Sequence, residues 1–212
     1  MSDDLTILPS RRHLFIIGAP SGAGKTSLVR ALISEQPDLE MSISHTTRPK
    51  RSGEIDGIDY NFVDTQEFNR LKREHAFLEH AKVFDNQYGT SYASIKEIWS
   101  KEKDALLEID WQGARKVRKS SSGCVSIFIF PPSLKALEDR LKGRGDSEED
   151  IRRRMQGAQS EMSHYKEFDY LIVNENFQEC LQKIKNIIEV EQLTLESQIV
   201  NEHKLIKELI AE

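Results

Sequence analysis

Short apolar runs separated by amphipathic stretches form the main pattern along the chain. The runs at 14–17, 105–109, 125–130 and 170–173 are almost entirely apolar, as is typical of strands that are buried on both faces. The segments between them carry helical periodicity. Because strands that alternate with helices build parallel sheets covered on both sides, the pattern predicts an α/β fold.

Capping residues predict where the helices begin. Each helical pattern follows a side chain that can accept a hydrogen bond from the free N–H groups of a first helical turn. These caps are Asp64, Ser91, Ser133, Ser147 and Asn176. We therefore expect helices over about 64–73, 91–101, 133–141, 147–163 and from 176 past 190, with a shorter helix over 112–119.

Two segments depart from this alternation. Residues 44–92 alternate polar and apolar positions and show hairpin-like spacing around 86–89, which predicts a smaller, partly antiparallel lobe inserted into the sheet domain. Weaker strand signals lie near 41–44, 60–63 and 77–84. Residues 142–154 begin with a basic, glycine-rich stretch between two helices, and we expect a mobile lid there. The remaining segments form the core of a single domain: 13–43, 93–141 and 155–212.

Composition narrows the class of protein. A net charge of −5 over 212 residues gives no electrostatic reason for binding nucleic acid or a membrane surface. The apolar runs are far shorter than a membrane span, and the acidic start lacks signal-peptide order. Cys124 and Cys180 form no metal-binding pattern, which favours free thiols in a reducing compartment. We expect a cytoplasmic protein.

A phosphate-binding loop is the strongest chemical signal. A glycine-rich turn follows the strand at 14–17 and opens a helix with Lys25 and Thr26. Backbone N–H groups of such a turn bind phosphate oxygens, the lysine contacts the β- and γ-phosphates, and the hydroxyl is a magnesium ligand. The usual pattern begins with glycine where this chain has alanine. The predicted ATP-binding residues are Ala19, Pro20, Ser21, Gly22, Ala23, Gly24, Lys25 and Thr26.

A second basic segment points to another anion. Three basic residues fall within positions 48–51, beside hydroxyl groups, and arginine suits phosphate better than a neutral donor does. A solvated basic turn explains the segment equally well when it is taken alone. Asp110 directly follows an apolar strand, where doubly wound sheets bind their ligands. Glu79 is either a solvent-facing strand residue or a ligand-binding carboxylate.

Four motifs in this order resemble guanylate kinases of the bacterial type over about residues 13–190. They are Ala-Pro-Ser-Gly-Ala-Gly-Lys-Thr, Ser-His-Thr-Thr-Arg-x-x-Arg-x-Gly-Glu, Tyr-Gly-Thr-Ser and Ile-Asp-Trp-Gln-Gly. The resemblance implies the P-loop nucleoside monophosphate kinase fold, in which 44–92 is a GMP-binding lobe and 142–154 an arginine-bearing lid. It also implies phosphoryl transfer from ATP to GMP with Mg²⁺.

The resemblance assigns roles to individual residues. For the GMP phosphate it implies Arg48, Arg51, Tyr60 and Tyr88, and for the base it implies Ser44, Glu79, Thr90 and Asp110. The chemistry agrees, because carboxylates complement the ring N–H and amine of guanine. Adenine presents an acceptor where guanine has its ring N–H, so a carboxylate there would be left unpaired.

The same resemblance selects Arg140, Arg144 and Arg154 as the side chains that close on ATP. Lys25, Arg51, Arg144 and Arg154 would then supply the positive charge for transfer. Without the family, ion pairs four residues apart would explain the arginines at 152–154 as parts of an exposed helix. Glu108 stands where the family commonly has aspartate, which leaves its part in magnesium binding open.

Two rival functions share parts of this pattern. A related P-loop kinase with another acceptor would keep the loop and the lid but would need a different lobe. A guanylate-kinase-like protein-binding module would lack a functional P-loop, whereas this chain retains Lys25 and Thr26. Residues 190–212 carry more apolar side chains than a short helix normally exposes, so we expect them to pack on a partner subunit, in a homo-oligomer, or back on the core.

Overall fold

A five-stranded parallel sheet forms the core of the computed structural model, which describes residues 12–83, 85–121, 123–143 and 147–210. The strand order is β2-β7-β1-β8-β9, and every neighbouring pair is parallel. The predicted α/β fold is therefore confirmed. The strands are β1 (Leu14–Gly18), β2 (Leu39–Met41), β7 (Asp104–Glu108), β8 (Cys124–Phe130) and β9 (Tyr170–Val173).

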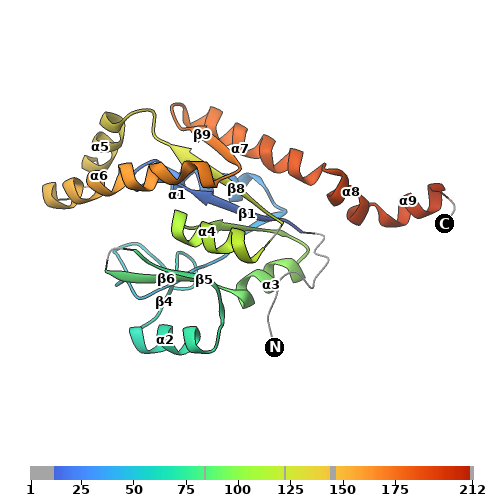
Figure 1. The fold of residues 1–212 in the computed structure, drawn as a ribbon, viewed down its shortest axis with the longest axis horizontal. Coiled ribbons are helices and arrows are strands. Elements are labelled where there is room, and N and C mark those ends of the chain that lie inside the picture. The colour runs from blue at the N-terminus through green and yellow to red at the C-terminus, as the bar shows by residue number, and fades with distance from the viewer. Residues whose placement is uncertain (1–11, 84, 122, 144–146, 211–212) are drawn as a thin grey trace.

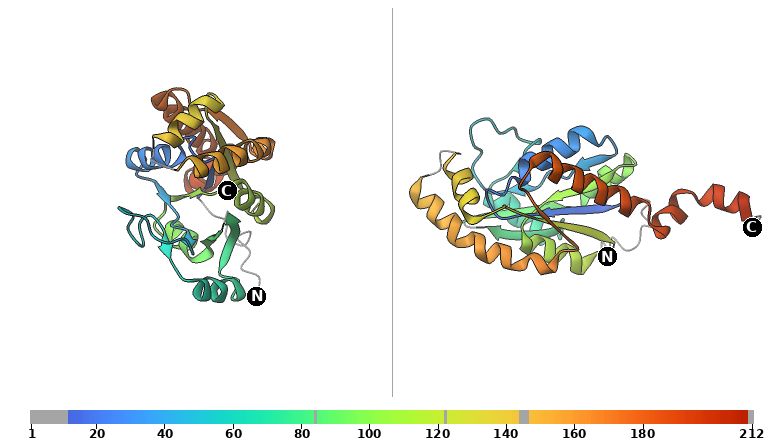
Figure 2. Two further views of the ribbon diagram at one scale, coloured as in Figure 1. Left: turned by 90° about the vertical axis from the view of Figure 1, so that its left-hand side faces the viewer. Right: turned by 90° about the horizontal axis from the view of Figure 1, so that it is seen from above.

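Helices cover both faces of this sheet (Figure 2). On one face α1 (Lys25–Glu35) and α7 (Phe177–Gln192) pack on Phe15 and Ile17, and on the other face α3 (Tyr92–Ser100) and α4 (Trp111–Ser120) pack on Leu14 and Ile16. Alternate residues of β1 thus serve opposite apolar clusters, which is why this strand has no polar position. Because all five strands run the same way, the loops that follow them meet at one edge.

The inserted lobe is a second sheet with its own helix, and it lies beyond α4 from the core sheet (Figure 1). Its strand order is β4-β3-β6-β5. Helix α2 covers it through Phe68, which is fully buried and stacks on Phe77 with ring centroids 4.7 Å apart. The elements are β3 (His45–Thr46), β4 (Asn61–Phe62), α2 (Thr65–Arg73), β5 (Phe77–Val83) and β6 (Asn86–Ser91).

Two predicted boundaries in this region are wrong. Val83 pairs with Asn86, so the β5–β6 hairpin turns before the predicted 86–89, and those residues belong to β6. The predicted strand near 41–44 ends at Met41. The Ser42 N–H still bonds to the carbonyl of Leu106 at 2.9 Å, after which the chain leaves the core sheet for the lobe.

The predicted helix caps are confirmed. Asp64, Ser91, Ser133, Ser147 and Asn176 each accept a hydrogen bond from the backbone N–H three residues ahead. Ser133 and Ser147 open α5 (Leu134–Lys142) and α6 (Glu148–Ser163). The predicted lid at 142–154 therefore includes the first turns of α6. A short 3₁₀ helix, η2 (His164–Glu167), connects α6 to β9.

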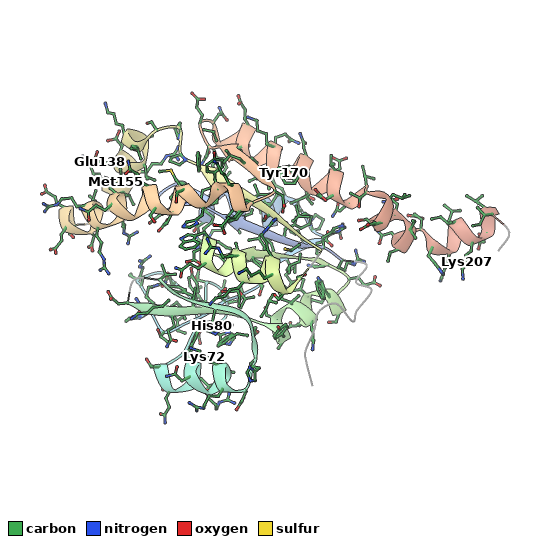
Figure 3. The ribbon with its side chains drawn as sticks, viewed as in Figure 1. Lys72, His80, Glu138, Met155, Tyr170 and Lys207 are labelled. Atoms are coloured by element: carbon green, nitrogen blue, oxygen red, sulfur yellow. The ribbon has the colours of Figure 1, made fainter. Side chains whose placement is uncertain are left out.

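The C-terminal helices α8 (Leu195–Asn201) and α9 (His203–Ile210) extend away from the sheet as an arm, on which Figure 3 labels Lys207. Neither helix buries a side chain, and Leu195 and Leu209 are 75% and 74% exposed. The arm meets the core near Ser197, whose hydroxyl lies 2.8 Å from His13 Nε2. The alternative of packing back on the core is therefore wrong for most of this segment. No helix within the described ranges is long and apolar enough to span a membrane.

Replacing Phe68 should show how much the burial of α2 against the lobe sheet contributes to the stability of the protein. Phe68→Ala removes the buried side chain of α2 and should destabilise the protein by about 3–5 kcal/mol, through lost burial and a cavity. Urea unfolding followed by circular dichroism measures the change, with the exposed Lys72→Ala of the same helix as control. A loss under about 1 kcal/mol, the usual size for surface substitutions, would show that α2 is not anchored this way.

Candidate active site

A cavity of about 390 Å³ lies at the edge of the core sheet where the strands end. Its walls come from the turn after β1, from the inserted lobe, from the segment after β7 and from α6. Parallel sheets place their ligands at this edge. Most predicted site residues line it: Ala19, Pro20, Ser21, Gly22, Gly24, Lys25, Thr26, Ser44, Arg48, Arg51, Tyr60, Glu79, Tyr88, Asp110 and Arg154.

The other predicted site residues have different places. Ala23 is buried behind the loop, and the Arg140 guanidinium donates to the Ala23 carbonyl at 3.1 Å. Thr90 is buried beneath Glu79 and donates to it. Arg144 lies outside the described residues.

The turn after β1 has the backbone geometry of a phosphate loop. Gly24 has φ +96°, a left-handed value that other residues rarely adopt, and begins α1 as its N-cap. Among the described residues other than glycine, His75 and Glu102 have a positive φ and Ala19 does not. The Cβ of Ala19 is therefore tolerated. Lys25 Nζ lies 3.2 Å from the carbonyl oxygen of Ile109, which keeps its charge at the mouth of the turn.

Thr26 and Glu108 bring two oxygen ligands together. The Thr26 hydroxyl donates to Glu108 Oε1 at 2.6 Å, so the glutamate reaches the first turn of α1 from the end of β7. Hydroxyl and carboxylate oxygens suit Mg²⁺, which takes few protein ligands when phosphates and water complete its shell. Within the described ranges, no three His, Cys, Asp or Glu side chains form a metal-binding group. The residues therefore fit a magnesium ion shared with a nucleotide.

Glu79 and Asp110 approach each other across Gly113. A Cβ at Gly113 would lie 2.8 Å from Glu79 Oε2 and 3.4 Å from Asp110 Oδ1, so only glycine leaves room there. Asp110 caps α4 by accepting from the Gly113 N–H at 2.8 Å. Thr90 donates to Glu79 Oε1 from its backbone N–H at 3.1 Å and its hydroxyl at 2.8 Å. These bonds orient Glu79 toward the side of the cavity that Asp110 shares.

The environment of Glu79 changes its acidity. This side chain is only 4% exposed, and burial raises its pKa to about 7. The nearby Asp110 charge acts in the same direction, while the two Thr90 bonds oppose it. A buried carboxyl with such a pKa, in a cavity, is typical of a functional position.

The arginine segment and two tyrosines form another wall of the cavity. Arg48 Nη2 pairs with Glu54 Oε1 at 2.7 Å, and its guanidinium lies 5.4 Å from the centre of the Tyr60 ring. The Tyr60 and Tyr88 rings are 5.9 Å apart. Burial raises the pKa of Tyr60 to about 12, so this phenol stays protonated and can donate to an anion at neutral pH.

Helix α6 contacts the phosphate loop through Ser21. Arg154 Nη1 donates to the Ser21 hydroxyl at 2.9 Å, and the Ser21 N–H donates to Glu161 Oε2 at 3.2 Å. Burial raises the pKa of Glu161. Glu161 is not among the predicted site residues, although its place seven residues after Arg154 puts both on one helix face. Across the cavity, Arg153 of α6 pairs with Asp85 of the lobe at 3.2 Å.

Comparisons with known proteins agree with this geometry. The family model for guanylate kinase matches residues 11–191. A guanylate kinase of Methylococcus capsulatus is 54% identical over 198 residues, covering 93% of this chain and 97% of the relative. One from Coxiella burnetii is 48% identical over 202 residues, covering 95% and 98%.

Solved structures show the same relationship. The crystal structure of guanylate kinase from Anaplasma phagocytophilum superposes with a TM-score of 0.75 at 36% identity, covering 88% of this chain and 89% of that one. The SH3-kinase fragment of tight junction protein 3 shares only the fold, at 18% identity and a TM-score of 0.50. The matches in sequence and structure show that the chain belongs to the guanylate kinase family.

Proposed function

We propose that this protein transfers the γ-phosphoryl group of ATP to GMP, giving ADP and GDP. One observation carries the proposal: a single cavity contains both the phosphate loop and the carboxylates of Glu79 and Asp110. The loop suits a triphosphate, and the carboxylates suit the ring N–H and amine of guanine. A protein-binding module would need neither set.

The loop residues 19–26 bind ATP in this scheme. Backbone N–H groups and the start of α1 receive the phosphates. Lys25 contacts the β- and γ-phosphates. Arg140 does not line the cavity, so it supports the ATP site indirectly, by donating to the Ala23 carbonyl behind the loop. Thr26, with Glu108 beside it, would hold Mg²⁺, and the ion would neutralise charge on the phosphate oxygens.

The lobe binds GMP in the same scheme. Four side chains that donate hydrogen bonds or carry positive charge bind its phosphate. The hydroxyls of Ser44 and Thr90 contact the base together with the carboxylates of Glu79 and Asp110. AMP would place a ring nitrogen that accepts hydrogen bonds against Glu79 or Asp110. Two buried acceptors that face each other with no hydrogen between them cost free energy. The phosphate-binding residues are Arg48, Arg51, Tyr60 and Tyr88.

Transfer needs alignment and positive charge rather than covalent help from the protein. Lys25, Arg51, Arg144 and Arg154 supply that charge around the transferred group. The lobe (44–92) and the lid (142–154) close against the core (13–43, 93–141 and 155–212) and exclude water, the competing acceptor. The Asp85–Arg153 pair supports this closure, because it joins lobe and lid directly.

The setting of the enzyme completes the proposal. We infer a cytoplasmic enzyme whose ligands are nucleotides rather than nucleic acid. The arm of α8 and α9 exposes Leu195, Leu205 and Leu209, which supports association into a homo-oligomer. Light scattering of the full chain measures that association.

An acceptor panel tests the proposed activity. ADP release should be fast with ATP and GMP and at least about 100-fold slower with AMP or UMP. Adenine lacks the ring N–H of guanine and uracil lacks its amine, so either base would leave a carboxylate acceptor of the site unpaired. A coupled ADP assay with each acceptor at equal concentration makes the comparison. Rapid turnover of AMP or UMP with no response to GMP would identify a different kinase.

Removing the loop lysine should abolish most of the turnover. Lys25→Ala takes away a charge that acts on the transferred group, so kcat should fall by about 10²–10³-fold while the fold remains. The exposed Lys135→Ala of α5 should keep normal turnover. Unchanged kcat in the Lys25 variant would contradict its role at the phosphates.

GMP affinity should depend on the protonation of Glu79. Its pKa is raised to about 7 in the free enzyme, and guanine binds the ionised form. Affinity should therefore rise between pH 6 and 8, with proton release on binding below pH 7. Calorimetry of Glu79→Gln should show weaker GMP binding and less dependence on pH, while ATP binding stays close to wild type. Equal losses for both nucleotides would argue against a base-reading role.

The same shift has a consequence for stability. Because the pKa of Glu79 is higher in the folded chain than in the unfolded one, its contribution is fully present below about pH 4.5 and is lost as the pH rises toward 7. GMP binding then has to offset the cost of the buried charge at neutral pH.

A further inference from the structure

Asn174 lies directly after β9, behind the phosphate loop, and the mechanism above gives it no role. Its side chain is 4% exposed. Its backbone N–H bonds to the carbonyl of Phe130 at 2.8 Å, and its side-chain amide donates to the carbonyl of Ala23 at 2.8 Å. A buried amide is thus fixed to the loop from an element 151 residues away in sequence.

The Ala23 carbonyl has a second donor. Arg140 Nη1 reaches it at 3.1 Å, and Arg140 Nη2 donates to the backbone carbonyl of Asn174 at 3.1 Å. Three elements therefore meet at one peptide group: the loop, the end of β9 and α5. Two donors on one carbonyl oxygen use both of its lone pairs and leave its direction little freedom.

The direction of this carbonyl decides what the next N–H can do. In a trans peptide the C=O of Ala23 and the N–H of Gly24 point in opposite directions within one plane, and the described residues contain no cis peptide. When Asn174 and Arg140 hold the carbonyl behind the loop, the Gly24 N–H must point toward the cavity. The neighbouring Ala23 N–H is already bonded to the carbonyl of Pro20 at 3.1 Å.

Gly24 shows the same constraint from the other side. A Cβ there would lie 2.6 Å from Asn174 Nδ2, much closer than van der Waals contact. The glycine is thus required twice, once by its φ of +96° and once by the approach of the Asn174 amide.

We propose that Asn174 is a positioning residue of the phosphate loop, which fixes the Ala23–Gly24 peptide so that the Gly24 N–H faces the phosphates of ATP. The inference rests on the proposed function, since it takes the loop to be the ATP site. It concerns the ATP site, because the hydrogen bonds described for Asn174 join it to Ala23, Phe130 and Arg140, which lie outside the lobe that we assign to GMP.

Two variants of Asn174 and one matched control test the proposal by calorimetric titration with ATP and with GMP. Asn174→Ala removes one donor and should weaken ATP binding about tenfold. Asn174→Asp sets an acceptor against the Ala23 carbonyl and should weaken it further. GMP affinity should stay within about twofold of wild type. Asn176→Ala, two residues on, removes the cap of α7 and should leave both affinities unchanged.

A purely structural role predicts a different result. If Asn174 only stabilised the fold, Asn174→Ala would behave like Asn176→Ala at equal thermal stability, or would lose ATP and GMP equally, and either outcome overturns the proposal. If Asn174→Ala fails to fold, Arg140→Met tests the same carbonyl from α5 and should also weaken ATP selectively. The proposal would also be overturned if the two single variants, Arg140→Met and Asn174→Asp, both kept the ATP affinity of the wild type.

A measurement without nucleotide keeps this inference separate from the proposed function. The Gly24 amide resonance in a ¹⁵N–¹H spectrum should shift in Asn174→Ala and stay in place in Asn176→Ala. Wild-type protein that binds no ATP would overturn the proposed function, whereas an unmoved Gly24 resonance would overturn the positioning of the peptide by Asn174.

Discussion

The structure depends on the turn after β1, which lies at the edge of the parallel sheet and lines the cavity. A helix start and a glycine turn leave backbone N–H donors without internal partners, and that costs free energy unless an anion satisfies them. Here the parallel sheet supports the turn from below, and the Ala23 carbonyl is held from behind by Asn174 and Arg140. We infer that the donors are thereby aimed before any nucleotide arrives, which is the condition for strong electrostatic stabilisation of a transferred phosphoryl group.

Specificity for the second substrate comes from a different physical effect. Glu79 is buried beside Asp110, and the cavity accepts this unfavourable pair of carboxyl groups because Gly113 leaves space and Thr90 donates two hydrogen bonds. The raised pKa of Glu79 measures the cost of that arrangement. In the function that we propose, guanine reduces this cost by bringing donors to the carboxylates, whereas a base with an acceptor there would increase it. The same burial that lowers stability near neutral pH therefore creates discrimination.

The phosphate loop and the Glu79–Asp110 pair face each other because the turn after β1, the lobe and α6 all line one cavity at the edge of the core sheet. Helix α6 contacts both sides: Arg154 reaches Ser21 of the phosphate loop, and Arg153 reaches Asp85 of the lobe. Exposed ion pairs contribute little stability, so the Asp85–Arg153 contact can break and form as nucleotides enter and leave. Ser21, in contrast, is bonded to both Arg154 and Glu161, which links the position of α6 to the state of the loop.

Local signals in the sequence by itself determined the central strands β1, β7 and β8, the helix caps and the glycine turn, because each depends on residues within a few positions of one another. The expected burial on both faces is wrong for β9, which lies at the sheet edge and leaves Leu171 and Val173 each 45% exposed. The order of the motifs, through their resemblance to a family, identified GMP as the expected acceptor of the phosphoryl group. Only the tertiary structure decided that Glu161 and Asn174 contact the loop and that Gly113 separates two carboxylates. The longest of these contacts joins residues 151 positions apart, and no local pattern in the sequence says which distant residues meet. The tertiary structure also decided the course of the C-terminal arm. An apolar stripe shows that a helix face is stabilised by burial, but it does not show which surface covers it.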